Sequence, residues 1–180
     1  MKAELNHYYS KFIFLFLIGI SFDSIAQKSS TNQVKLLTLT YFNCFTFDLP
    51  DNLTRTSGEK TESWTNIVVY ANENDSVDVM IRMKNEPADL KDIKELHESS
   101  VSFYNGTILR SELKNINGQK VLVFQMTGYW NGAKNESTWL KCFVVSRNSL
   151  YQFLIRFPKG YKKYSTDLLD RIINSIKICS

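Results

Sequence analysis

The chain has 180 residues, with 22 Lys and Arg against 18 Asp and Glu and a formal net charge of +4 at pH 7. Hydrophobic residues make up 43% of it, which is enough for one folded domain to build its own core. The small positive charge is spread along the chain. Nucleic-acid binding requires a clustered basic face, so no nucleic-acid partner is expected.

An apolar segment near the N-terminus has the pattern of a secretory signal. Lys2 and Lys11 flank a polar start, residues 12–20 are almost continuously apolar, and Ser24 and Ala26 supply the small residues that a signal peptidase needs. This run is shorter than the ~20 residues that cross a bilayer. A cleavable signal peptide is therefore favoured over a transmembrane anchor or a buried strand.

The expected domain organisation follows from that leader. It comprises a signal peptide over 1–26, a disordered polar lead-in over 27–33 and a single domain over 34–180. No second apolar run approaches membrane-spanning length, so we expect no membrane insertion after cleavage. The sequence thus predicts an exported protein, periplasmic or extracellular.

Strand-like segments open the domain. Apolar side chains predict strands over 34–41, 44–49, 64–70 and 77–83. The last of these alternates most clearly. One face carries Val77, Val79, Ile81 and Met83, and the other carries Asp78, Arg82 and Lys84. This alternation is typical of a strand with one buried face.

The period then changes to that of a helix. The following side chains recur at three- and four-residue spacing: Leu90, Ile93, His97, Val101 and Tyr104. Pro87 is expected in the first helical turn, and Asp89 is favourable near the positive end of the helix dipole. Asn105-Gly106 is expected to end the helix. The pattern indicates a helix packed on a sheet.

The second half adds more strands and a final helix. Strands are predicted over 107–116, 121–126, 139–145 and 150–157, with a tight hairpin turn at Asn117-Gly118. A last helix is predicted from Ser165 as N-cap. Its apolar stripe consists of Leu168, Leu169, Ile172, Ile173 and Ile176. The order predicts an α+β fold, a twisted and mainly antiparallel sheet covered by helices in an α/β/α sandwich.

Three local signatures, in this order, resemble the PsbP-like superfamily. They are Phe45-Thr46-Phe47-Asp48-Leu49-Pro50, the hairpin Ile116-Asn117-Gly118-Gln119-Lys120, and Tyr151…Tyr164…Leu169…Ser175-Ile176-Lys177-Ile178. The resemblance covers most of residues 44–178 and is nearest to the bacterial exported branch. It implies a fold rather than a chemistry, because the matching pieces are architectural. The chain departs from the family at 51–54, where a Trp is usual.

Reactive groups are scarce in the mature chain. His97 is its only histidine and lies on the apolar stripe of the first helix, so packing is a better interpretation than a catalytic base. The acidic turn at 72–75 lacks the spacing and the glycine of a calcium-binding EF-hand and is interpreted as a solvated turn. No phosphate-binding glycine loop or nucleophile elbow is present. The sequence therefore predicts no catalytic residue, no metal and no cofactor.

The cysteines and asparagines leave questions open. Three cysteines permit at most one internal disulfide. Cys44 and Cys142 lie in apolar runs and are expected in the core, whereas Cys179 lies in the tail. The sequence does not decide whether any of them form a disulfide. Four sites have the Asn-x-Ser/Thr pattern: Asn52, Asn74, Asn105 and Asn135.

An aromatic group provides the candidate site. Its members are Trp64, Tyr129, Trp130 and Trp139, expected around strand ends and the loop at 131–132. Such a group suits a ligand- or partner-binding patch, although core or edge packing is the commoner role. We expect a non-enzymatic binding or accessory module whose partner is an unknown protein or small ligand. The alternatives are a small-molecule or lipid carrier with a pocket between sheet and helix, and an enzyme of unrecognised type.

Overall fold

A computed structural model provides the coordinates of the chain. The described residues are 34–56, 64, 66–129 and 133–179. The segments expected at 1–26 and 27–33 lie outside them. Residues Val34–Ser180 form one compact unit. None of the helices within the described ranges is long and apolar enough to span a membrane.

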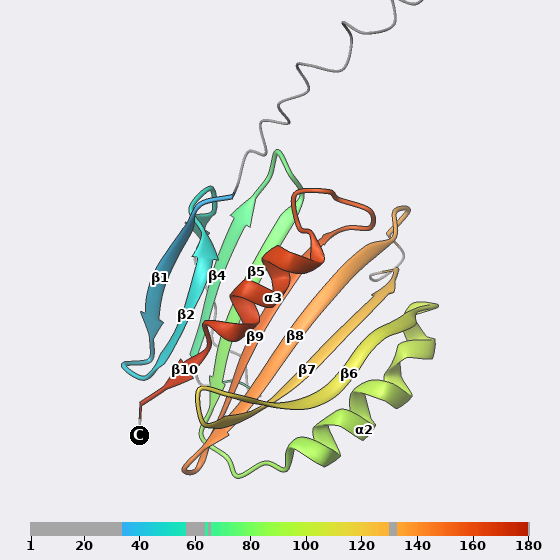
Figure 1. The fold of residues 1–180 in the computed structure, drawn as a ribbon. Coiled ribbons are helices and arrows are strands. Elements are labelled where there is room, and N and C mark those ends of the chain that lie inside the picture. Colours follow the sequence, from blue (N-terminus) through green and yellow to red (C-terminus); the bar gives the residue numbers. More distant parts are fainter. Residues whose placement is uncertain (1–33, 57–63, 65, 130–132, 180) are drawn as a thin grey trace, which may run out of the picture. The chain divides into compact units, whose positions relative to one another are not determined.

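Seven strands form an antiparallel sheet in the order β3-β4-β5-β9-β8-β7-β6 (Figure 1). Their bounds are β3 (Thr54–Thr56), β4 (Asn66–Asn72), β5 (Val77–Lys84), β6 (Thr107–Ile116), β7 (Gln119–Gly128), β8 (Ser137–Ser146) and β9 (Ser149–Pro158). Every neighbouring pair is antiparallel. The predicted α+β class with a mainly antiparallel sheet is confirmed.

Tight turns set the register of the long strands. Asn117 and Gly118 both have positive φ, of 49° and 79°, and join β6 to β7 as a hairpin, as predicted. Arg147, with φ 55°, lies in the turn from β8 to β9. Because the register is fixed at both hairpins, alternate residues of each strand face the same side of the sheet.

A second, three-stranded sheet contains both ends of the described chain. It has the order β1-β2-β10, with β1 (Leu36–Tyr41), β2 (Phe45–Pro50) and β10 (Lys177–Ile178). The sequence did not separate β1 and β2 from the larger sheet. It also did not predict β3 or β10, because segments of two or three residues are too short to show a period.

Two α-helices and a short 3₁₀ helix complete the fold: α2 (Leu90–Ser100), η1 (Val101–Tyr104) and α3 (Thr166–Asn174). Asp89 caps α2 by accepting a hydrogen bond from the backbone of Lys91 at 2.7 Å, so α2 begins after Pro87 rather than at it. Ser165 caps α3, as predicted.

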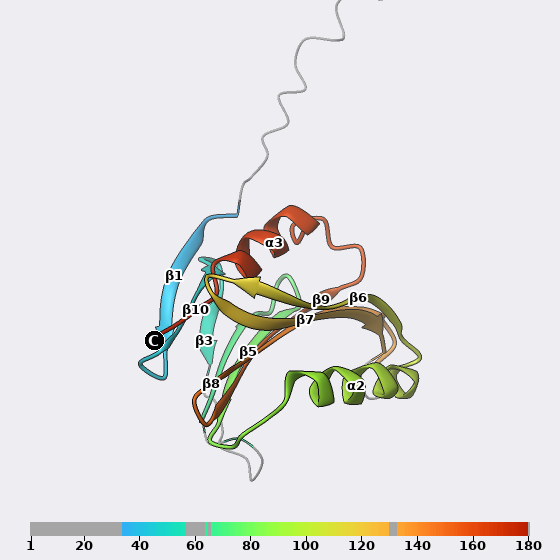
Figure 2. The ribbon, with the colours of Figure 1, turned by 60° about the horizontal axis from the view of Figure 1, so that its bottom comes forward.

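The two faces of the large sheet are packed differently. Figure 2 shows α3 and α2 on opposite sides of it. The α3 side and the small sheet enclose the main core, which contains Phe45, Phe47, Phe153 and Ile172 with no exposed surface. On the α2 side there are two smaller clusters, one around Leu122 and Phe143 and one around Phe124 and Trp139. The site described below lies on this side.

Candidate functional site

A pocket of about 270 Å³ lies between α2, η1 and the large sheet, and we refer to it as the α2 pocket. It is partly open to solvent. The lining residues are Trp64, Arg82, His97, Tyr104, Met126, Trp139, Lys141, Phe143, Gln152 and Leu154. The volume is near the lower end of the range for small-ligand sites.

The pocket exists because α2 covers only part of the sheet. The helix packs on β6, β7 and β8, while β9 and β5 continue the sheet beyond it. Strand pairing places Arg82 opposite Gln152, and Lys141 opposite Leu154. Opposite residues of an antiparallel pair point to the same face. The floor of the pocket is therefore built from residues on one face of four adjacent strands, β5, β9, β8 and β7.

Aromatic rings form the walls. Trp139, only 3% exposed, packs against Tyr104 of η1 with ring centroids 5.8 Å apart. The guanidinium carbon of Arg82 lies over the ring of Trp64, 5.5 Å from the ring centroid. A cation held over an indole face is favourable, more so when it is desolvated. The walls thus combine apolar surface with positive charge.

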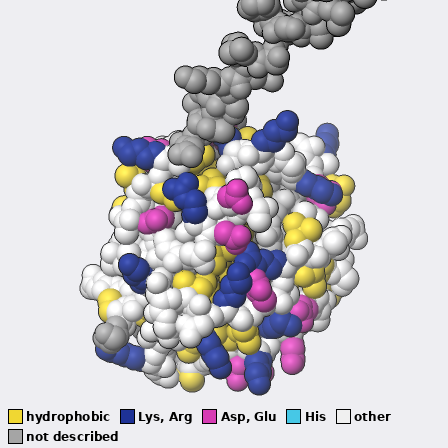
Figure 3. Space-filling model, viewed as in Figure 1, with side chains coloured by type: hydrophobic (Ala, Val, Ile, Leu, Met, Phe, Trp, Pro, Cys, Tyr) yellow, Lys and Arg dark blue, Asp and Glu magenta, His cyan; other side chains and the backbone are white. Residues whose placement is uncertain are grey.

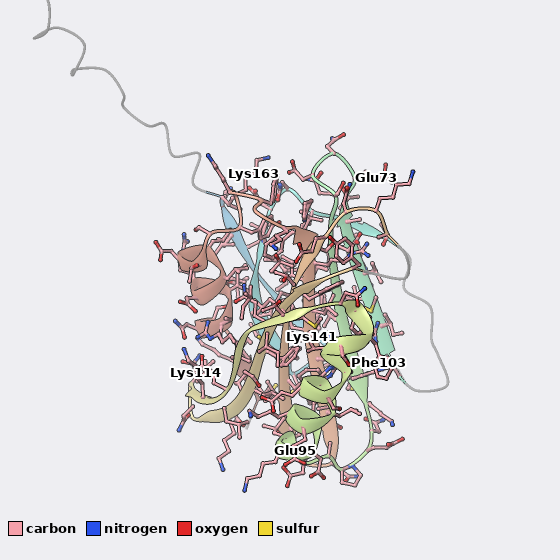
Figure 4. All side chains as sticks on the ribbon, turned by 90° about the vertical axis from the view of Figure 1, so that its right-hand side faces the viewer. Glu73, Glu95, Phe103, Lys114, Lys141 and Lys163 are labelled. Carbon is pink, nitrogen blue, oxygen red and sulfur yellow. The ribbon has the colours of Figure 1, made fainter. Side chains whose placement is uncertain are left out.

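Two cations, Lys141 and Arg82, are the charged residues of the pocket lining. Lys141 Nζ lies 3.3 Å from His97 Nδ1 and 5.9 Å from the ring centroid of Phe124, and Figure 4 shows it beside α2. Burial, and then the charge of Arg82, lower the pKa of Lys141 to about 8. Burial also lowers the pKa of Arg82. Among the residues that the structure describes, neither has an acidic partner.

The charge pattern of the α2 pocket differs from that of the face that carries α3. In Figure 3, Lys and Arg side chains are interspersed with Asp and Glu over the face that carries α3. The ten residues that line the α2 pocket include no carboxylate. The pocket therefore favours anions over cations.

His97 packs as the sequence indicated. Its ring packs against those of Phe124 and Phe143, at centroid distances of 5.5 and 4.9 Å. Burial, with a contribution from the charge of Lys141, lowers its pKa to about 4, so the imidazole is neutral at pH 7. A histidine with so low a pKa is a weak general base. The described part of the chain contains no cluster of three or more His, Cys, Asp or Glu residues suited to a metal ion.

Gln152 is an uncharged polar residue of the floor. Its side chain is 4% exposed, and its Oε1 atom accepts no hydrogen bond from any described residue. Burying such an acceptor without a donor costs ~1–3 kcal/mol. Native proteins rarely leave buried acceptors unpaired, and an unpaired one beside a cavity suggests a place for a donor supplied by a ligand.

A second cavity, of about 330 Å³, continues the α2 pocket along the sheet. It shares Arg82, Trp139 and Leu154 with the α2 pocket. Its other lining includes Asp78 and Arg156, which form an ion pair across β5 and β9. Of the charged residues that line these two cavities, Arg156 is thus paired with a carboxylate, whereas Arg82 and Lys141 have no acidic partner within the described part of the chain.

The structure separates the four predicted aromatic residues. Trp64 and Trp139 both line the α2 pocket, although they are far apart in sequence. Tyr129 is 40% exposed and is not part of the lining, but its backbone N–H donates to the carbonyl of Tyr104 at 2.8 Å. Trp130 lies outside the described residues.

Sequence reasoning missed the polar residues of the pocket. Arg82 was placed on the polar face of its strand and interpreted no further. Lys141 is the one charged residue within the apolar run 139–145, and Gln152 is a polar residue within the apolar run 150–157. A polar residue inside such a run is the available signal, since strand interiors seldom bury one without a reason.

The fold is similar to those of several solved structures. CyanoP, a cyanobacterial PsbP from Synechocystis, matches with a TM-score of 0.61 at 10% identity, over 86% of this chain and 99% of that one. LpqN of Mycobacterium tuberculosis, described as involved in cell envelope biogenesis, matches at 0.53 and 13% identity, over 83% and 93%. A Bacteroides thetaiotaomicron protein matches at 0.52 and 16% identity, over 82% and 49%. No family model and no curated protein matches the sequence.

Proposed function

We propose that this chain, which has the PsbP-like fold, is an exported accessory module that binds a small ligand in the α2 pocket without transforming it. The resemblance inferred from the sequence motifs is confirmed at the level of the fold. The signal-like N-terminus supports export. The description of LpqN as a protein of cell envelope biogenesis supports the same compartment.

The observation that carries the proposal is a buried, unsatisfied polar group in an aromatic pocket. Gln152 Oε1 lacks a donor while the surrounding walls are apolar and partly open to solvent. Ligand sites combine such walls with a few well-placed polar groups. The other candidate, an enzyme, would need an acid or base of suitable pKa. Lys141, with a pKa of about 8, would suit proton transfer, but the neighbouring His97, with a pKa of about 4, is too weak a base to act as its counterpart.

A neutral fluorescent probe tests the pocket directly. N-phenylnaphthylamine brightens on entering an apolar site, and we expect it to bind the purified protein in a saturable way. Leu154 lines both cavities, so Leu154→Trp should fill the site and abolish saturable binding. Leu37→Trp, a matched change on β1 at a partly exposed position, should bind as the wild type does.

The readouts separate binding from folding. Far-ultraviolet circular dichroism and the melting temperature of both variants show whether each is folded. Equal probe binding by folded Leu154→Trp and by the wild type would contradict a ligand site at this pocket.

Binding of a protein partner at Tyr129 and Trp130 is a separate prediction from ligand binding in the α2 pocket. Tyr129 presents part of its ring to solvent at the end of β7. Changing both residues to Ala should weaken capture of a protein partner from an envelope extract. Retention of every partner would count against this surface, and would leave the α2 pocket unaffected.

A further inference from the structure

The α2 pocket carries enough chemical detail to identify the class of its ligand. Its two charged lining residues are both positive, and each is partly buried. A buried cation without a counter-charge is costly, and a bound anion removes that cost. The apolar walls make a bare inorganic anion a poor fit, because it would leave Trp64 and Trp139 uncovered.

We propose that the α2 pocket binds molecules that carry one oxyanion, a carboxylate or sulfonate, on an aromatic or other apolar body, with Arg82 and Lys141 holding the oxyanion. The inference rests on the proposed function and adds the ligand class to it. The guanidinium of Arg82 presents a planar fork of donors that matches an oxyanion. Lys141 adds a point charge from the neighbouring part of the floor.

Gln152 adds a second requirement. Arg82 and Gln152 are paired across β5 and β9, so the unpartnered Oε1 lies beside the cationic end of the pocket. Oε1 accepts hydrogen bonds only. A ligand with an N–H or O–H group near its oxyanion would satisfy it. The pocket therefore distinguishes such a ligand from a simple fatty acid, which offers no donor there.

A matched pair of probes tests the oxyanion requirement. Anilinonaphthalene sulfonate and N-phenylnaphthylamine share one aromatic body and differ by a sulfonate. We expect the sulfonate probe to bind the wild type at least about tenfold more tightly, which corresponds to about 1.4 kcal/mol. Arg82→Gln and Lys141→Met should each lose most of that preference while binding the neutral probe as before.

The controls remove a charge elsewhere. Arg171→Gln on α3 and Lys177→Met on β10 change exposed residues away from the pocket and should keep the full preference. Equal affinity of the wild type for the two probes would overturn the proposal. An equal loss in the pocket variants and the surface variants would do the same, since it would indicate a diffuse charge effect. Failure of both probes to bind would instead overturn the proposed function.

An independent observation concerns Cys44 and Cys179, which lie at one end of the β2–β10 pair in the small sheet. Phe45 and Ile178 are paired across β2 and β10, so Cys44 and Cys179 occupy the next position of the same antiparallel ladder. The backbone N–H of Cys179 donates to the carbonyl of Cys44 at 3.1 Å. Opposite Cα atoms in such a ladder lie about 4.5–5.5 Å apart, within the range that a disulfide spans.

We infer that Cys44 and Cys179 form a disulfide in the exported protein. The two thiols lose two protons and two electrons as the S–S bond forms, and the disulfide of a thiol–disulfide oxidoreductase accepts those electrons and becomes two thiols. Cys142 is fully buried in the main core and takes no part. The bond would join residues 135 positions apart and hold the chain end on β2.

Thiol counting tests the disulfide. Protein recovered from an oxidising compartment and denatured without reductant should react with one equivalent of a thiol reagent, at Cys142. Peptide mapping should join the peptides of Cys44 and Cys179. Under oxidising conditions, Cys44→Ser and Cys179→Ser should lower the melting temperature by the same amount. In reductant, the melting temperature of each variant should differ from that of the wild type only by the small effect of the substitution. Three reactive thiols, or a Cys179-linked dimer, would overturn the inference.

Discussion

His97 makes stability depend on pH through its burial against two phenylalanine rings. Its pKa in the folded protein, about 4, lies below the ordinary value of 6.5. Between these values the unfolded chain binds a proton that the folded protein does not. The stability that depends on neutral His97 is therefore complete above pH 6.5 and is lost as the pH falls toward 4.

We expect His97→Phe to remove this acid sensitivity. Between pH 7 and pH 5 the wild type should lose about 2 kcal/mol of unfolding free energy more than the variant does. Urea unfolding at the two pH values measures the difference. Parallel losses in the two proteins would show that His97 is solvated and not buried.

We expect the charge of Lys141 to favour ligand binding and to lower the stability of the ligand-free protein. Its pKa, about 8, lies below the ordinary value of 10.5, so the charged form of Lys141 destabilises the folded protein. This destabilisation is complete below pH 8 and decreases to zero as the pH rises above 10.5. We expect Lys141→Met to stabilise the ligand-free protein by about 1–3 kcal/mol at pH 7 and by less at pH 10.

Chemical unfolding of the two proteins across this pH range checks the prediction for Lys141. The surface change Lys177→Met, at an exposed position, should alter stability little at either pH. A destabilised Lys141→Met protein at pH 7 would mean that its ammonium group is stabilised by contacts worth more than its desolvation.

At the scale of elements, the junction of η1 with β7 depends on close backbone approach. A Cβ atom at Gly128 would lie 2.7 Å from the carbonyl oxygen of Tyr104 and 3.2 Å from the ring of Trp139. Because Tyr104 and Trp139 both line the α2 pocket, this glycine lets the wall of the pocket close against the sheet.

Gly128→Ala should therefore push η1 away from β7. We expect a loss of about 1–3 kcal/mol of unfolding free energy, typical of overpacking, together with a shifted tryptophan emission as Trp139 gains solvent. Thermal unfolding and fluorescence measure the two effects. Unchanged values for both would mean that η1 moves freely, and would contradict the close packing described here.

The elements that could be predicted from sequence are those with a strong local signal. The five apolar residues predicted for the last helix are all buried, but Ile176 lies after α3, which ends at Asn174. The N-cap at Ser165 was predicted correctly because capping is local. The hairpin at Asn117-Gly118 followed from residues that tolerate positive φ. β3 was missed because three residues are too few to show a period, and β10 because its partner β2 is distant in sequence.

The candidate site could be predicted only in part for the same reason. Trp64 and Trp139 were selected as aromatic residues, yet their meeting in one pocket depends on the order of strands in the sheet. Lys141 and Gln152 lie on strands joined by a tight turn, but no local pattern indicates that β5, which carries Arg82, lies beside β9. A single polar residue in an apolar strand predicts that something unusual is nearby, and it does not reveal what its neighbours are.

Across the whole molecule, the two sides of the large sheet should differ in stability. Four of the nine residues of α3 are buried in the main core, whereas Leu90 is the buried residue of α2. Segments with few buried contacts open most easily. We therefore expect the side that carries the α2 pocket to open more readily than the α3 side, and a ligand to enter there.

Hydrogen exchange followed by mass spectrometry should resolve this difference. Peptides from α2 and η1 should exchange before those from α3, β8 and β9, and the sulfonate probe should slow α2 selectively. Uniform exchange across both helices would instead indicate one cooperative unit. In that case the ligand would have to enter without any movement of α2.

The pairing of β2 with β10 also has a consequence for the order of folding. Phe45 and Phe47 are buried against Tyr151 and Phe153, and Phe45 pairs with Ile178 of β10. Contacts between residues so far apart in sequence close a long loop, and they form slowly because the entropy of that loop must be lost first. We therefore expect the small sheet to be completed after the hairpins of the large sheet, which join neighbouring segments of the chain.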